Sequence, residues 1–127
     1  MPHIIVETTE AHGLSATDLL SALHGEAMTI EAFPLGGIRT RLVRPDAALV
    51  GDTTLGDAFC YVRVRIGKGR SEAVRRDIGE RLFRVVEDWA APALDADEPI
   101  SLGLEVEEIE GPTFKRNTFH ALLGGKD

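Results

Sequence analysis

The residue with the most distinctive chemistry in this chain is the proline that follows the first methionine. A small residue after an initiator Met normally allows that Met to be removed, which would leave Pro2 as the N-terminal residue. Its nitrogen would then be a basic secondary amine. Free α-amino groups have pKa values of about 8, and burial or neighbouring cations lower them towards neutrality. Such an amine suits general-base catalysis of proton transfer at carbon. With Met1 still attached, the nitrogen is an amide and cannot act as a base.

A second candidate for chemistry is the segment 67–71, Gly-Lys-Gly-Arg-Ser. It lacks the fuller phosphate-loop pattern, so it is only a weak indication of a nucleotide site. Its glycines let the backbone approach a ligand, and the N-terminus of a following helix offers free N–H groups. Arg70 at this point suits a carboxylate. A flexible turn with an exposed arginine explains the pattern equally well.

Charge is distributed unevenly along the chain, whose formal net charge is −7. Residues 1–38 carry −5, residues 39–84 carry +5, and residues 85–127 carry −7. The cationic middle third indicates either surface charges that pair locally or an arginine site for a small anion. The overall acidic balance argues against binding nucleic acid through a generally basic surface.

Several other classes of protein are disfavoured by the residue types present. The single cysteine, Cys60, excludes an internal disulfide framework, and we expect it to be a small core residue. The four histidines show no metal-ligand spacing, so we expect no metal: His3, His12, His24 and His120. No apolar run approaches the roughly 18 residues of a membrane span, and no signal peptide is recognisable. We therefore expect a cytoplasmic protein with neither nucleic acid nor membrane as partner.

Hydrophobic periodicity predicts four strands and two helices. The strands are expected within residues 1–7, 38–43, 58–66 and 100–109, the third having the clearest alternation. One helix is predicted to begin at Ser15 or Thr17. The other is predicted to begin after Ser71 and to end before Pro92. The tail 117–123 is compatible with either a helix or a strand.

The order of these elements is strand–helix–strand, a long loop, then strand–helix–strand. It predicts an α/β (α+β) fold of two fused β-α-β units in a single domain, residues 1–127. The pseudo-repeat covers residues 1–45 and 57–110, and a C-terminal tail covers residues 111–127. Right-handed crossovers predict a mixed sheet with both helices on one face.

Blocks of sequence along nearly the whole chain resemble one enzyme family. They are Pro2–Glu7, Phe33–Arg41, Ile66–Ser71, Glu105–Glu108 and Phe114–Leu122. Their order and residues are similar to the 5-carboxymethyl-2-hydroxymuconate Δ-isomerase family of the tautomerase superfamily. The loop 45–57 and the helix before Phe33 match poorly. The resemblance implies a tautomerase-like fold, a homotrimer, no cofactor, and an N-terminal proline as the catalytic base.

The family's reaction converts the dienol 5-carboxymethyl-2-hydroxymuconate into its 2-oxo tautomer during aromatic-acid (homoprotocatechuate) catabolism. Carried over to this chain, the resemblance implies that Pro2 moves the proton. It implies that Arg39 and Arg70 bind carboxylates or polarise the developing 2-oxo group, which makes them catalytic residues together with Pro2. Arg41, on the same strand face as Arg39, is expected to help bind this small polycarboxylate enol.

Three alternatives to this isomerase stay open. A tautomerase acting on another enol, such as that of phenylpyruvate, would share Pro2 but need fewer arginines. A non-catalytic small-ligand-binding module is also compatible, since ferredoxin-like regulatory domains have the same element order. An inactive relative would be favoured by permanent retention of Met1.

Overall fold

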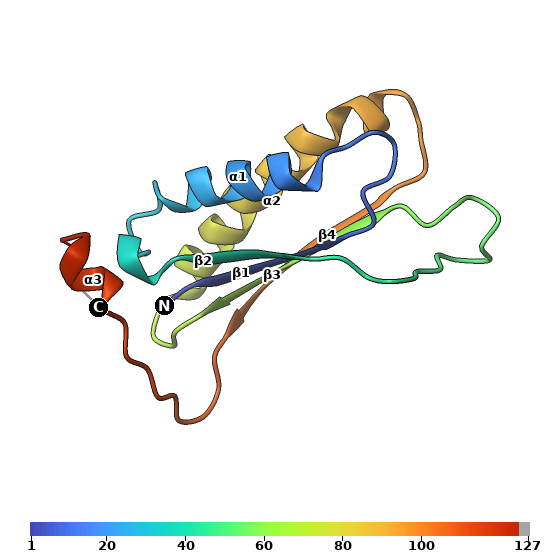
Figure 1. Ribbon diagram of the computed structural model, residues 1–127. Helices are drawn as coiled ribbons and strands as arrows, with labels where there is room; N and C mark the ends of the chain where they lie inside the picture. The colour runs from blue at the N-terminus through green and yellow to red at the C-terminus, as the bar shows by residue number, and fades with distance from the viewer. Residues whose placement is uncertain (125–127) are drawn as a thin grey trace.

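The computed structural model describes residues 1–124 (Figure 1). Its elements are β1 (His3–Thr8), α1 (Ala16–Ala27), the 3-10 helix η1 (Leu35–Gly37), β2 (Arg39–Val43), β3 (Phe59–Ile66), α2 (Glu72–Asp95), β4 (Ser101–Glu108) and α3 (Phe119–Leu122). All four predicted strands and both predicted helices are present. The tail, for which the sequence left helix and strand open, forms the short helix α3.

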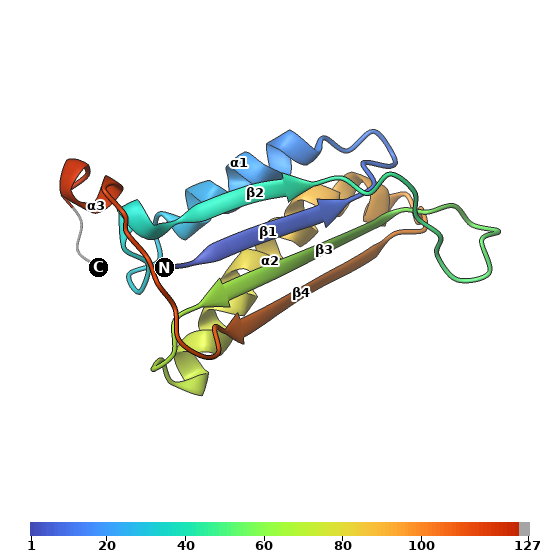
Figure 2. The ribbon, with the colours of Figure 1, turned by 60° about the horizontal axis from the view of Figure 1, so that its bottom comes forward.

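The four strands form one mixed sheet in the order β2-β1-β3-β4. The strands of each β-α-β unit are parallel, β1 with β2 and β3 with β4, and the two units join through the antiparallel pair β1–β3. Both long helices cover the same face of the sheet, as predicted (Figures 1 and 2). No helix of residues 1–124 covers the opposite face, which we call the open face. This is the two-layer α+β architecture that the sequence indicated.

The core lies between the sheet and the two long helices. Alternate residues of β3 point into it, so Cys60, Val62 and Val64 are buried while Tyr61 and Arg63 lie on the open face. The other main core side chains come from β1, α1 and α2: Ile4, Val6, Leu19, Leu23, Ile78, Leu82 and Val86. Burial raises the pKa of the Cys60 thiol to about 11, so this cysteine is a core residue rather than a nucleophile.

Side-chain caps determine where the two long helices begin. The hydroxyl of Ser15 accepts a 3.3 Å hydrogen bond from the backbone N–H of Asp18, so Ser15 rather than Thr17 is the N-cap of α1. Ser71 caps α2 in the same way, accepting from the N–H of Val74 at 3.2 Å. Each cap contributes about 1 kcal/mol to helix stability.

The prediction that the second helix ends before Pro92 is wrong, because α2 contains Pro92. Proline lacks an N–H and disfavours a helix interior, but only the last turn of α2 follows it. That turn is anchored by Ala93, which is 3% exposed. It is closed by hydrogen bonds from the N–H of Ala96 to the Pro92 carbonyl and from the N–H of Glu98 to the Ala93 carbonyl. This burial and these bonds offset the cost of the proline.

The chain after β4 returns to the N-terminal end of β1. In Figure 2 it runs past the N-terminus before α3 lies against η1. This docking needs a glycine, since a Cβ on Gly36 would lie 2.9 Å from the backbone nitrogen of His120. Within residues 1–124, no helix has both the length and the apolar character needed to cross a membrane.

Candidate active site

Pro2 lies immediately before β1, with its side chain fully buried. Its carbonyl accepts a 2.9 Å hydrogen bond from the backbone N–H of Arg39, the first residue of β2. The parallel register then places His3 opposite Arg39 and Ile5 opposite Arg41. The start of β1 is therefore fixed beside the two arginines of β2.

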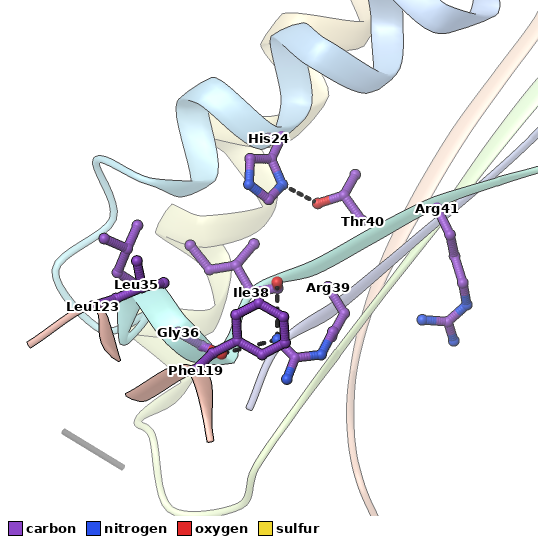
Figure 3. A pocket seen from close by; sticks show the side chains of 9 residues that line it. All are labelled: His24, Leu35, Gly36, Ile38, Arg39, Thr40, Arg41, Phe119 and Leu123. Carbon is purple, nitrogen blue, oxygen red and sulfur yellow. Dashed lines mark hydrogen bonds between the residues drawn. The ribbon is translucent and has the colours of Figure 1, made fainter. Parts of the chain in front are cut away.

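Arg39 has a guanidinium that is both held in place and open to a ligand. Its Nη1 donates to the carbonyls of Gly36 at 2.9 Å and Ile38 at 3.2 Å. The guanidinium carbon lies 5.3 Å from the ring centroid of Phe119, a cation–π contact with α3 (Figure 3). Both hydrogen bonds use Nη1, so Nε and Nη2 form the edge that could bind a carboxylate side-on.

A cavity of about 580 Å³ opens along β2 next to this guanidinium. We call it the Arg39 cavity; its charged walls are Arg39 and Arg41, and Phe119 with other apolar side chains covers one end (Figure 3). His24 of α1 also lines it, and its Nδ1 lies 2.7 Å from the hydroxyl of Thr40. Two arginines beside an apolar wall suit a small organic anion.

His3 is surrounded by cations on the open face. It lies between Arg39 of β2 and Arg65 of β3 in the strand register, and Arg41 Nη1 lies 3.1 Å from its Nδ1. A guanidinium only donates, so Nδ1 accepts and the ring proton is on Nε2. Burial, followed by the charges of Arg41 and Arg65, lowers the pKa of His3 below its ordinary value. The start of β1 therefore lies next to several positively charged side chains.

Arg70 has a different environment from Arg39. Its Nη2 donates to the carbonyl of Ala32 at 2.7 Å and its Nη1 to that of Gly67 at 3.3 Å. These bonds tie the loop before α2 to the segment between α1 and η1. Arg70 does not line the Arg39 cavity. The pairing of β1 with β2 thus places the backbone of Pro2 beside Arg39 and Arg41, although Pro2 itself does not line the Arg39 cavity. Arg70 is a clamp between two loops.

Sequence reasoning did not identify His3, Arg65, His24 or Phe119 as parts of this region. The signal for Arg65 was its place beside Arg63 on the polar face of the third strand. Its position next to His3 depends on the antiparallel register between β1 and β3, which no local pattern specifies. Among residues 1–124, no group of three or more His, Cys, Asp or Glu could hold a metal ion.

The fold defines a class of proteins built from two β-α-β units whose four strands form one mixed sheet. A structural neighbour of this class is a fused 4-OT solved as a symmetric trimer. It has a TM-score of 0.61 at 20% identity, covering 94% of this chain and 98% of that one. At 20% identity this similarity shows a shared fold and nothing about activity.

Closer comparisons identify the family within that class. The family model described as 5-carboxymethyl-2-hydroxymuconate isomerase matches residues 2–123. The 5-carboxymethyl-2-hydroxymuconate Delta-isomerase of Escherichia coli is 33% identical, over 97% of this chain and 99% of that protein. The crystal structure of a 5-carboxymethyl-2-hydroxymuconate isomerase from Deinococcus radiodurans R1 has a TM-score of 0.87 at 35% identity, covering 96% and 93% of the two chains. The chain belongs to the 5-carboxymethyl-2-hydroxymuconate isomerase family, and it is an isomerase.

Proposed function

We propose that this chain ketonises the dienol 5-carboxymethyl-2-hydroxymuconate, with the amine of Pro2 as the general base. The observation that carries the proposal is the position of Pro2. It is fully buried at the start of β1, hydrogen-bonded to Arg39 and next to a cationic region. The family model also matches from residue 2 onwards, which supports Pro2 as a residue that belongs to the matched domain.

Removal of Met1 turns the Pro2 nitrogen from an amide into a secondary amine. Burial and positive neighbours both disfavour the charged form, so we expect the pKa of this amine to fall below the ordinary value of about 8. A large part of the amine is then neutral near pH 7 and able to accept a proton. No metal or cofactor is needed in this scheme.

The proton moves from oxygen to carbon without net oxidation. Pro2 takes the proton of the 2-hydroxyl group, and the electron pair of that bond forms the C2=O double bond. The C2=C3 electrons shift to C3=C4, and the C4=C5 electrons take a proton at C5. The protonated Pro2 donates that proton, so the amine returns to its neutral form and the product is the 2-oxo tautomer.

The arginines supply charge for the carboxylates and for the oxygen that becomes the 2-oxo group. Arg39 binds a carboxylate through Nε and Nη2, and Arg41 binds from the same strand face. Arg70 acts at the same substrate from the loop before α2, in addition to its two bonds to backbone carbonyls. Positive charge fixed before the reaction stabilises the developing oxyanion without reorganisation.

The assembly we propose is a homotrimer, and the physiological setting is aromatic-acid (homoprotocatechuate) catabolism in the cytoplasm. The fused 4-OT neighbour is a symmetric trimer. In this chain β2 and β4 are the edge strands of the sheet, and the open face carries arginine and glutamate side chains. Unpaired strand edges and a half-covered face favour association with further copies.

The experiment is a substrate comparison with protein whose intact mass shows that Met1 has been removed. Ultraviolet absorbance follows ketonisation of 5-carboxymethyl-2-hydroxymuconate and, separately, of the enol of phenylpyruvate. We expect a much larger kcat/KM for the first substrate, because its carboxylates can engage several arginines. A preference for phenylpyruvate would make the chain a tautomerase of another enol. No rate above background with either would favour a ligand-binding module or an inactive relative.

A further inference from the structure

A second cavity, of about 420 Å³, lies at the N-terminus and is lined by Met1. We call it the Met1 cavity. Its other walls come from His3, from the end of β3 and the loop after it, and from the segment that follows β4, including Thr113 and Lys115. Figure 2 shows that segment running past the N-terminus. The cavity therefore depends on the return of the chain after β4.

The ionisable residues that line the Met1 cavity are all basic: His3, Arg65, Lys68 and Lys115. Two of them have acidic partners outside the lining. Arg65 Nε lies 3.4 Å from a Glu107 carboxylate oxygen, and Lys68 Nζ lies 2.8 Å from one of Glu110.

Lys115 differs from the other cations of this cavity. Among the ion pairs of residues 1–124, none involves Lys115. Its charge is thus not neutralised by a neighbouring carboxylate. A cavity with one uncompensated ammonium, beside the guanidinium of Arg65 whose buried Nε makes only the 3.4 Å ion pair with Glu107, is suited to an anion.

Loss of Met1 joins this cavity to the proposed base. Met1 is covalently attached to the Pro2 nitrogen, so the volume that Met1 occupies borders that nitrogen. The Cα of Met1 also lies 3.5 Å from the place where a Cβ on Gly37 would be, which puts it beside η1 as well. We expect removal of Met1 to expose the Pro2 nitrogen to this cavity and to extend the cavity towards η1, beside which the Met1 Cα lies.

The substrate we propose has three carboxylates, two at the ends of the muconate chain and one on the carboxymethyl branch. Arg39 and Arg41 lie on β2, on one side of His3, whereas Arg65 lies on β3, on the other. A substrate whose reacting atoms are at Pro2 can therefore meet cations on both sides. The Met1 cavity supplies the second group of cations.

We propose that the Met1 cavity binds a carboxylate remote from the enol, with Lys115 as its main charged partner and Arg65 as the second. Lys115 is then a specificity-determining residue that favours polycarboxylate enols over monocarboxylate enols. The inference rests on the proposed isomerase function, because it assumes that the reaction takes place at Pro2.

The test uses Met1-free protein carrying Lys115→Met, which keeps an apolar stem and removes the charge. Arg116→Met is the matched control, because Arg116 is the adjacent exposed cation and does not line the cavity. We expect Lys115→Met to raise KM for 5-carboxymethyl-2-hydroxymuconate by about 10-fold, the size expected for a lost charged hydrogen bond. For the enol of phenylpyruvate the change should stay within about 3-fold, and Lys115→Arg should restore most of the loss.

Equal effects of Lys115→Met and Arg116→Met would contradict the proposal, as would equal effects on the two substrates. If the wild-type protein does not isomerise the tricarboxylate substrate, the proposed function fails separately. The cavity is then tested by calorimetric binding of tricarballylate, a saturated tricarboxylate. Weaker binding by Lys115→Met than by Arg116→Met supports the cavity as a carboxylate site. No wild-type binding, or equal binding by both variants, overturns it.

Discussion

The backbone N–H of Arg39 donates a 2.9 Å hydrogen bond to the carbonyl oxygen of Pro2. This bond begins the parallel pairing of β1 with β2, which continues with His3 opposite Arg39. The register thus places the proposed base and the proposed carboxylate-binding arginine side by side. A slip of one residue would turn Arg39 and Arg41 to the helix-covered face. The pairing of β1 with β2 therefore determines the geometry of the site.

Arg39→Ala should reduce kcat/KM for 5-carboxymethyl-2-hydroxymuconate by about 100-fold, because it removes a side-on charged interaction with substrate. Arg39→Lys should recover only part of this, since an ammonium lacks the planar fork. Steady-state ultraviolet kinetics measure both. Arg44→Ala is the matched control, because Arg44 pairs with Glu10 at 2.6 Å and lines neither cavity. A loss in Arg44→Ala as large as that in Arg39→Ala would contradict the assignment.

Arg70→Met should lower the free energy of unfolding by about 1–3 kcal/mol, because it leaves the carbonyls of Ala32 and Gly67 without their charged donor. Urea unfolding measures this change. If Arg70 also acts on substrate, kcat should fall in protein that is still folded at the assay temperature. Unchanged stability combined with unchanged kcat would show that neither role is correct.

Gly36→Ala should displace α3 from η1, because the added Cβ would lie 2.9 Å from the His120 backbone nitrogen. Phe119 would then leave the guanidinium of Arg39, and KM should rise. Hydrogen exchange of the amides of α3 and η1 reports the displacement directly. Gly25→Ala in α1 is the control, since nothing lies within 4 Å of its Cβ position, and it should stabilise the helix by about 1 kcal/mol. Unchanged exchange in Gly36→Ala would show that α3 does not depend on this contact.

The free energy of unfolding should decrease as the pH is lowered below 6.5, the ordinary pKa of His3. Burial, Arg41 and Arg65 lower the pKa of His3 in the folded chain, so between the two pKa values the unfolded chain binds the extra proton. The folded state therefore loses stability as pH falls through this window, and His3 makes no pH-dependent contribution above it. Urea unfolding at about pH 7.5 and about pH 5.5 should show a smaller loss for His3→Asn than for wild type. The same loss in both proteins would mean that other groups cause it.

Local patterns in the sequence were sufficient to predict most of the fold. The alternation of β3, from Phe59 to Ile66, determined which side chains are buried, and the caps Ser15 and Ser71 determined where α1 and α2 begin. The end of α2 was not predictable in this way. Whether a helix continues past Pro92 depends on what its last turn packs against, which is tertiary information.

Only part of the candidate site could be predicted from the sequence. Pro2 stood out because of its chemistry, and Arg39 and Arg41 through a resemblance to a family. The cations around His3 could not be foreseen, because Arg65 reaches that position through pairing of β1 with β3 across more than fifty residues of chain. Phe119 lies on a helix that the sequence did not distinguish from a strand. Its contact with Arg39 could therefore not be predicted either.

The role of Pro2 as the base is tested by comparing kcat for three proteins on 5-carboxymethyl-2-hydroxymuconate: Met1-free wild type, Met1-free Pro2→Ala, and wild type that retains Met1. Intact mass establishes the N-terminus of each, and urea unfolding establishes that each is folded. We expect rapid ketonisation by the first protein and losses of at least about 100-fold in the other two, the size expected for a lost general base. Full kcat in either the Pro2→Ala protein or the Met1-retaining protein would contradict a free Pro2 amine as the base.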